Sequence, residues 1–251
     1  MAKSSAKDKS PAKPAKGKDK SKPAADATKE TLEDVMDELA SVAPGAGRAT
    51  DSPTAGNIVV VGVGTGGATS ALSVTDNLSN TLTAGPSITN GQGADISYLF
   101  YYTAPSGVTG FTAHWTGTAN AAIYLEEYSG ALGGVNPVGG SNASTAVPAS
   151  PVTISLISSQ NNSFVVGSLY FPGNPNLGTL TAGNSRQSLN DGGDEGRLAD
   201  NTAASSGTSV SLTNTINANQ GWAVTAVELL PNAAPPANSS HNFLMLMGCG
   251  T

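Results

Sequence analysis

The sequence predicts an all-β fold, an antiparallel β-sandwich preceded by a basic arm and one short helix. Three observations lead to this class. The 251 residues include 30 glycines and only 12% charged residues, a composition typical of strands and turns. From Asn57 onward, short runs rich in β-branched and aromatic residues alternate with turn signals. About ten such runs over roughly 175 residues suit a two-sheet sandwich of jelly-roll type.

The first thirty residues form a lysine-rich arm. They hold nine of the twelve basic residues of the chain. With almost nothing apolar to bury, residues 1–30 are expected to be disordered. The arm is either a solubilising tail or an electrostatic contact with an acidic partner, made by Lys13, Lys16, Lys18, Lys20 and Lys22. Binding of nucleic acid is possible only through this arm, although its lack of arginine weakens that interpretation.

Residues 31–43 are predicted to form a short amphipathic helix. Thr31 is a suitable N-cap, and acidic residues follow it in the first turn. The apolar side chains recur at helical spacing and make one stripe, formed by Leu32, Val35, Met36 and Leu39. A helix this short is marginal alone, so the stripe should dock on the sandwich or on a partner. Pro44-Gly45 ends the helix, and residues 44–56 are interpreted as a linker.

Residues 57–231 are predicted to form the β-sandwich domain. Strands are expected near 57–63, 70–75, 80–83, 95–103, 109–116, 121–128, 151–157, 163–171, 178–182, 208–216 and 221–230. Residues 232–251 are interpreted as a linker with an apolar tail. Its run Phe243-Leu244-Met245-Leu246-Met247 is too short to span a membrane. The run either pairs as a last strand or docks on a partner, chiefly through Phe243, Leu244 and Leu246.

Charge and cysteine content limit the possible functions. From Asp51 onward there are ten acidic residues and two arginines, so this part is poorly suited to nucleic acid. The single cysteine, Cys249, allows no internal disulfide. If Met1 is the true start, the absence of an apolar stretch in the first 22 residues predicts a protein without a secretory signal. No membrane association is expected.

Four phrases resemble a β-sandwich module of bacterial extracellular proteins and phage virion structural or decoration proteins. SVTDNLSNTLT (73–83) is similar to a segment of that module that begins with VTD and contains asparagine. The run from Tyr101 to Gly130 ends in EYSG, as the next segment of the module does. SFVVGSLYFPGN (163–174) and GWAVTAVELLP (221–231) resemble its later core segments. The resemblance covers roughly 57–231 in order. It implies display, adhesion or particle coating, and it supplies no catalytic residues.

Motifs for catalysis and cofactors are weak. Gly62, Gly64 and Gly67 fit a G-x-G-x-x-G pattern, but no helix or second strand with an acid follows. We interpret these glycines as a strand end and a flexible loop, with no cofactor. His114 and His241 lack a nucleophile elbow beside them. Glu126 and Glu127 adjoin on one strand and therefore face opposite sides, with Glu127 facing solvent or capped by a turn. The protein is therefore expected not to be an enzyme.

Two further surfaces have competing interpretations. The acidic turn 190–196 could offer Asp191, Asp194 and Glu195 to Ca²⁺, but its spacing is not that of an EF-hand and such turns are usually only solvated. No metal is therefore expected. Tyr98, Phe100 and Tyr102 share one strand face. That face is expected to belong to the core, and its alternative role is a platform for sugars.

The leading hypothesis is a non-enzymatic virion structural protein, most simply a head decoration or minor capsid protein of a tailed phage. Its partner would be the major capsid protein or another virion protein, and it would be a homo-oligomer located in the virion. One alternative is a glycan-binding, adhesive module of an extracellular or cell-surface protein that binds surface glycans. Another is an icosahedral capsid protein with a genome-binding basic arm.

Overall fold

Fifteen β-strands make up the described part of the chain, and no helix occurs within it. The computed structural model describes residues 46–49, 51–67, 70–90, 95–116, 120–129, 131, 137–146, 150–172, 178–190, 194–216 and 221–232. Every strand pairing is antiparallel. The predicted all-β class is therefore confirmed, whereas the lysine-rich arm, the helix at 31–43 and the tail beyond residue 232 lie outside the described residues.

The N-terminal half contains seven strands in two sheets. They are β1 (Ala46–Ala49), β2 (Ile58–Gly66), β3 (Ser70–Asp76), β4 (Thr83–Thr89), β5 (Ile96–Thr103), β6 (Phe111–Thr116) and β7 (Asn120–Tyr128). One sheet has the order β1-β6-β3 and the other the order β4-β5-β2-β7. We call them outer sheet 1 and inner sheet 1.

The C-terminal half contains eight strands, also in two sheets. They are β8 (Val138–Ala146), β9 (Val152–Ile157), β10 (Phe164–Pro172), β11 (Leu180–Ala182), β12 (Asn184–Asn190), β13 (Asp194–Thr202), β14 (Ser209–Asn214) and β15 (Trp222–Leu229). Inner sheet 2 has the order β12-β13-β10-β15-β8, and outer sheet 2 has the order β11-β14-β9. The strands of the described residues thus form four sheets, where the sequence led us to expect two.

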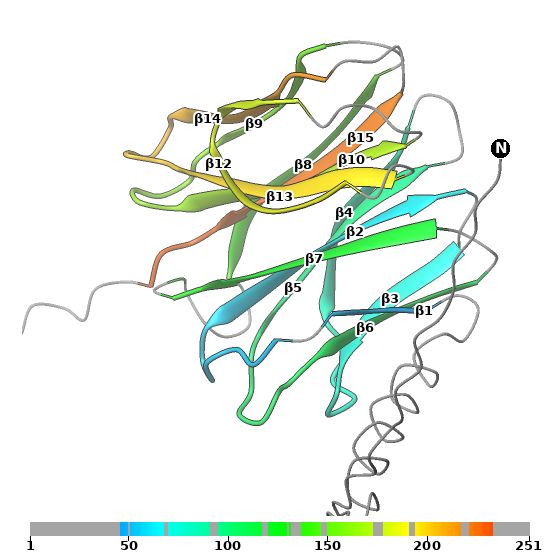
Figure 1. The fold of residues 1–251 in the computed structure, drawn as a ribbon. Coiled ribbons are helices and arrows are strands. Elements are labelled where there is room, and N and C mark those ends of the chain that lie inside the picture. The colour runs from blue at the N-terminus through cyan, green and yellow to red at the C-terminus, as the bar shows by residue number, and fades with distance from the viewer. Residues whose placement is uncertain are drawn as a thin grey trace, which may run out of the picture. The chain divides into compact units, whose positions relative to one another are not determined.

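Three apolar clusters show how the sheets stack (Figure 1). One cluster joins outer sheet 1 to inner sheet 1 through residues such as Phe111 and Val61. A second joins the two inner sheets, with Ile58 and Val60 against Val166 and Leu198. The third joins inner sheet 2 to outer sheet 2. The order of layers is therefore outer sheet 1, inner sheet 1, inner sheet 2, outer sheet 2.

The stacking explains why the central strands are continuously apolar. The inner sheets are covered on both faces, so their strands gain nothing from alternating polar and apolar residues. Every residue of β15 is buried, and in β2 all but the last residue are buried. β9 and β14, in an outer sheet, instead alternate between buried and more exposed positions. The long run of valines in β2 is the sequence signature of this position.

The two halves repeat one strand arrangement. The order β4-β5-β2-β7 matches β12-β13-β10-β15, and β1-β6-β3 matches β9-β14-β11, so β1 to β7 correspond to β9 to β15. Strands β4, β2 and β7 of inner sheet 1 lie against β15, β10 and β12 of inner sheet 2. Because corresponding strands exchange places across this contact, the halves are related by an approximate two-fold axis.

Loop details follow the same correspondence. Gly56 and Asn162 both precede a central strand with positive φ, 91° and 59°. Gly56 donates its N–H to the carbonyl of Ala104, and Asn162 donates to the carbonyl of Ala203. Both positions lie two residues before β2 or β10, which start 106 positions apart (58 and 164). Left-handed backbone is tolerated best by Gly and Asn, which explains the residue types found there.

Several strands differ from the sequence-based prediction. Residues 46–49, assigned to the linker 44–56, form β1 in outer sheet 1. The strand expected at 80–83 is β4 at Thr83–Thr89. Strands β8, β12 and β13 were not predicted, because their sequences VGGSNASTA, NSRQSLN and DEGRLADNT are poor in β-branched residues.

Candidate functional site

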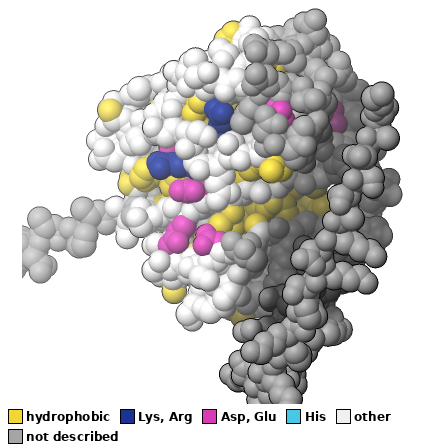
Figure 2. Space-filling model, in the orientation of Figure 1, with side chains coloured by type: hydrophobic (Ala, Val, Ile, Leu, Met, Phe, Trp, Pro, Cys, Tyr) yellow, Lys and Arg dark blue, Asp and Glu magenta, His cyan; other side chains and the backbone are white. Residues whose placement is uncertain are grey.

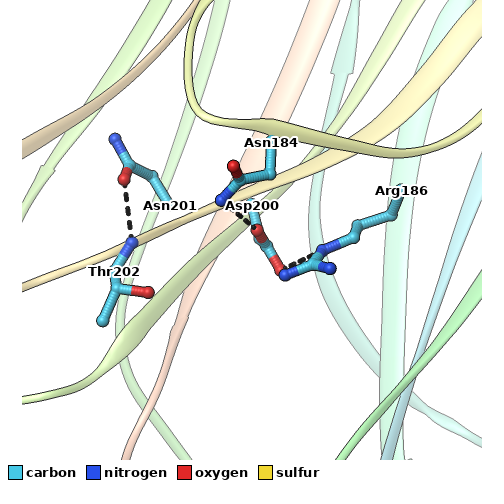
Figure 3. Close-up of polar contacts among 5 residues, drawn as sticks. All are labelled: Asn184, Arg186, Asp200, Asn201 and Thr202. Carbon is cyan, nitrogen blue, oxygen red and sulfur yellow. Dashed lines mark hydrogen bonds and ion pairs between the residues drawn. The ribbon is translucent and has the colours of Figure 1, made fainter.

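A polar cluster centred on the buried Asp200 lies where β12 and β13 contact β7, and Figure 3 shows its hydrogen bonds to Asn184 and Arg186. Arg186 Nε donates to Asp200 Oδ2 at 2.7 Å, and Asn184 Nδ2 donates to Asp200 Oδ1 at 3.3 Å. The Asp200 side chain is 1% exposed and that of Arg186 is 39% exposed. The pairing of β12 with β13 shifts register between Ser185 and Gln187. Arg186 occupies this β-bulge, a feature that commonly redirects a side chain.

The neighbours of this ion pair come from β7. Burial raises the pKa of Tyr128, and the charges of Asp200 and Glu126 add to the rise. Burial also raises the pKa of Glu126, an effect partly offset by Arg186. At neutral pH Tyr128 therefore stays a neutral phenol, which makes it a poor nucleophile or base. The cluster acts as a polar contact between the two inner sheets.

A second arrangement occurs twice, once in each half. Glu127, opposite Val59 on β2, accepts hydrogen bonds from the Thr54 N–H and from the Asn57 side chain. Its counterpart Glu228, opposite Val165 on β10, accepts from the N–H groups of Ser159 and Gln160 and from the hydroxyls of Ser159 and Ser163. Each carboxylate holds the loop that leads into a central strand. Glu127 is thus capped by a turn, one of its two expected environments.

A third carboxylate organises the turn after β3. Asp76 accepts the N–H groups of Leu78 and Asn80, the Asn80 side chain and the Tyr102 hydroxyl. Burial tends to raise the pKa of Asp76, but these hydrogen bonds outweigh it and lower the pKa. This turn is the SVTDNLSNTLT phrase, so the chemistry of that phrase is the folding of a turn.

The first two glycines of the G-x-G-x-x-G pattern, Gly62 and Gly64, are packing positions, and our assignment of them to a strand end and a flexible loop was wrong; β2 does end at Gly66, and Gly67 lies beyond it. Gly62 and Gly64 lie inside β2, on the face that contacts inner sheet 2. A Cβ on Gly62 would stand 2.7 Å from Ser168 Oγ, and one on Gly64 would stand 2.0 Å from Tyr170 Cδ2. Ser168 and Tyr170 occupy the corresponding positions of β10. Because Gly62 and Gly64 have no side chains, β2 leaves room for the side chains of Ser168 and Tyr170 in β10.

The acidic segment at 190–196 is mainly strand. β12 ends at Asn190 and β13 begins at Asp194, with Asn190 paired to Glu195, and Asp191 lies outside the described residues. Glu195 is 1% exposed, because β13 is covered by outer sheet 2 on that face. Across the described residues there is no group of three His, Cys, Asp or Glu side chains placed to hold a metal ion. The prediction that this segment is a solvated loop is therefore wrong for Glu195.

The shared aromatic face belongs to the core. Phe100 is 3% exposed, and Tyr98 and Tyr102 are partly buried against the same cluster. Tyr102 makes an edge contact with Phe111, with ring centroids 5.9 Å apart. These rings lie between inner sheet 1 and outer sheet 1, so this face belongs to the core, as expected. His114 Nε2 lies 3.0 Å from Thr75 Oγ1 at the surface.

All partner-binding residues named from the sequence fall outside the described residues, namely the lysines of the arm, the stripe Leu32, Val35, Met36 and Leu39, and the tail residues Phe243, Leu244 and Leu246. The described ranges contain no helix that is long and apolar enough to cross a membrane. Comparisons with protein-family models, curated proteins and solved structures found no match. The resemblance to the bacterial and phage module thus rests on the four sequence phrases.

Sequence reasoning missed Asp200, Arg186 and Glu228 as organising residues. Asp200 and Arg186 lie in strands that the sequence did not predict. Glu228 was included in a predicted strand, and its repeat of the Glu127 position is a signal that could have been found. In both cases a glutamate follows an apolar run near the end of a strand, in IYLEEY and in VTAVEL.

Proposed function

We propose that this protein is a non-enzymatic structural component of a virion, a head decoration or minor capsid protein that is attached through its terminal extensions. The observation that carries the proposal is the separation of charge. The lysines lie in the first thirty residues, while the strand-forming part has ten acidic residues and two arginines from Asp51 onward. An arm of one sign and a stacked body of the other favour attachment by the arm.

The surface chemistry of the strands supports exposure to water. On outer sheet 2, the hydroxyls of Ser155 and Ser211 lie 2.7 Å apart and those of Thr153 and Thr213 lie 3.2 Å apart. Figure 2 shows a face with few charged side chains and with uncharged polar groups and backbone over most of the described area. Such cross-strand hydroxyl pairs stabilise an exposed sheet without adding charge.

The finer assignment, a sandwich of jelly-roll type, is part of the same proposal. It is supported by the stacking of antiparallel sheets on shared apolar clusters. The resemblance to the phage and bacterial module adds the expectation of display, adhesion or particle coating. Assembly into a homo-oligomer is a separate part of the proposal. The contact residues would be Lys13, Lys16, Lys18, Lys20 and Lys22 in the arm, Leu32, Val35, Met36 and Leu39 in the apolar stripe, and Phe243, Leu244 and Leu246 in the tail.

The test is incorporation into particles that lack the protein. Full-length protein and a chain cut to residues 46–232, which keeps β1, would be added to such particles and separated by sedimentation. We expect the full-length protein to co-sediment and the cut chain to remain in the supernatant. Replacing the five arm lysines by glutamine should weaken incorporation. Raising the salt concentration should lower the incorporation of the protein that keeps its lysines, and it should leave that of the glutamine variant unchanged.

Equal incorporation of the full-length and cut chains would contradict the proposal. The binding surface would then lie on the strands, and adhesion to surface glycans would become the better hypothesis. A thermal melt of the cut chain with the same midpoint as the full-length protein is the control that it remains folded. A terminase or portal gene beside the coding sequence would further support a virion role, whereas an export gene would oppose it.

A further inference from the structure

Glu126 points toward the contact between the two inner sheets. Successive side chains of a strand alternate between its two faces. In β7, Ala122, Tyr124 and Tyr128 all belong to the apolar cluster between the inner sheets, so Glu126 lies on the same face. It is partly buried there, beside β12 and β13, which both contact β7. A carboxylate at the border of a packed contact loses part of its hydration, and its charge is costly for that reason.

The charged and titratable groups around Glu126 come from β7, β12, β13 and the segment before β2. They are Tyr128, Glu127, Arg186, Asp200 and Asp51. Arg186 is the one cation in this set, and its Nε donates to Asp200 at 2.7 Å, which Figure 3 shows. In the part of the chain that the structure describes, Glu126 thus faces a cation that already neutralises another carboxylate.

The surplus of negative charge favours the neutral form of Glu126 in the folded protein. Burial raises the pKa of Glu126, the charges of Asp200, Asp51 and Glu127 add to the rise, and Arg186 partly offsets it. The folded protein therefore takes up this proton at higher pH than the unfolded chain does. The resulting stabilisation is fully present below about pH 4.5, and it is lost as the pH rises through the folded pKa.

β12 is the element on which this charge acts most strongly. Among the described strands it pairs with β13 alone, and residues 184–189 are exposed. Its Gln187 accepts the N–H of Leu125, the residue that precedes Glu126, at 2.8 Å. A strand with few buried contacts opens locally at a low cost in free energy. A modest electrostatic change beside β12 therefore alters how often this strand opens.

We propose that Glu126 is a proton-operated switch at the contact between the inner sheets. When Glu126 is neutral, β12 stays closed against β7, and when Glu126 is charged, its repulsion of Asp200 lets β12 open more often. The switch responds to a change between neutral and mildly acidic surroundings, and the fold is the same in both states. It is a property of the isolated chain and does not depend on the virion proposal.

Hydrogen exchange of the purified full-length protein at about pH 7.5 and about pH 4.5 tests the switch. Protection factors, which are corrected for the pH dependence of chemical exchange, would be measured for the amides of β12 relative to those of β14 in outer sheet 2. From the higher to the lower pH, we expect the relative protection of β12 to rise about threefold, the size of a partly exposed charge interaction. In Glu126→Gln the relative protection should be high at both pH values.

Glu127→Gln is the matched control, because it removes the same charge from the next residue, on the opposite face of β7. The hydrogen bond from Asn57 lowers the pKa of Glu127 below 4.5, so this carboxylate keeps its charge over the range measured. The control should therefore keep the threefold response of the unchanged protein. Loss of the response in Glu127→Gln would show that the switch does not reside at Glu126.

Two further results would overturn the proposal. One is a relative protection of β12 that is the same at both pH values in the unchanged protein, and the other is an equal response in Glu126→Gln and the unchanged protein. The carboxyl carbon of Glu126, followed by NMR, gives a reading that needs no variant. Its titration midpoint should lie above 4.5 and should rise further in Arg186→Gln, which removes the neighbouring cation. A midpoint at or below 4.5 would contradict the switch.

Discussion

Gly64→Ala is expected to destabilise the protein by about 3 kcal/mol, the upper end of the usual cost of overpacking and the largest effect of any glycine-to-alanine change in β2. The new Cβ would stand 2.0 Å from Cδ2 and 2.5 Å from Cγ of Tyr170, whose side chain is fully buried between the inner sheets. Tyr170 is fully buried, so either its ring or the facing backbone of the inner sheets must shift to accommodate the new Cβ. Urea unfolding followed by tryptophan fluorescence measures the loss.

A matched control and a second-site change make this result specific. Gly140→Ala places a Cβ no closer than 3.7 Å to Glu228 Oε2, an ordinary contact, and it should change the free energy of unfolding by less than about 1 kcal/mol. In the double variant Gly64→Ala/Tyr170→Ala, the total destabilisation should fall at least about 1 kcal/mol short of the sum of the two single changes. Additive effects would show that Gly64 does not contact Tyr170.

Glu228→Ala should lower the free energy of unfolding by about 3 kcal/mol at pH 7, while Glu127→Ala should lower it by about 1 kcal/mol. The two glutamates hold equivalent loops, but Glu228 is fully buried with four hydrogen bonds and Glu127 is partly exposed with two. The buried donors around Glu228 would lose their acceptor, whereas those around Glu127 can bind water. Similar losses of stability in Glu228→Ala and Glu127→Ala would contradict the difference in burial between the two glutamates.

The pH dependence of stability provides a second readout for Glu228. Burial tends to raise its pKa, but the hydrogen bonds from Ser163, Ser159 and Gln160 outweigh this and lower the pKa below 4.5. The unfolded chain therefore takes up a proton at higher pH than the folded protein, so the stabilisation is present above about pH 4.5 and is lost as the pH falls through the folded pKa. Between pH 6 and pH 3, Glu228→Gln should lose less stability than the unchanged protein. An equal loss in both would show that Glu228 does not titrate with folding.

The strands with strong β-propensity could be predicted from the sequence, and the charged and polar ones could not. β2, β5, β7, β10 and β15 are rich in valine, isoleucine or aromatic residues because two covered faces require them. β13 is not predicted from the sequence, because DEGRLADNT has four charges and few β-branched residues. Its burial depends on distant partners, such as Arg186 for Asp200 and Asn214 for Arg197. Such partners cannot be read from local sequence.

The repeat of the two halves was also invisible in composition and periodicity. The corresponding strands share few residues, for instance IVVVGVGTG in β2 and FVVGSLYFP in β10. What they share is the position of special residues, such as the glutamates at 127 and 228 and the left-handed residues at 56 and 162. The same reasoning explains the misread glycines, because a glycine that accommodates a side chain from another sheet looks, in sequence alone, like one in a flexible loop.

The stacking of the two inner sheets through corresponding strands is tested most directly by NMR contacts between glycine α protons and tyrosine rings. Nuclear Overhauser effects are expected between Gly64 and the Tyr170 ring, and between Gly196 and the Tyr124 ring, since a Cβ on Gly196 would lie 2.1 Å from the Tyr124 hydroxyl. These contacts cross from one half of the chain to the other and can arise only if the inner sheets face each other. Their absence in a sample with well-dispersed amide signals would contradict the four-layer arrangement.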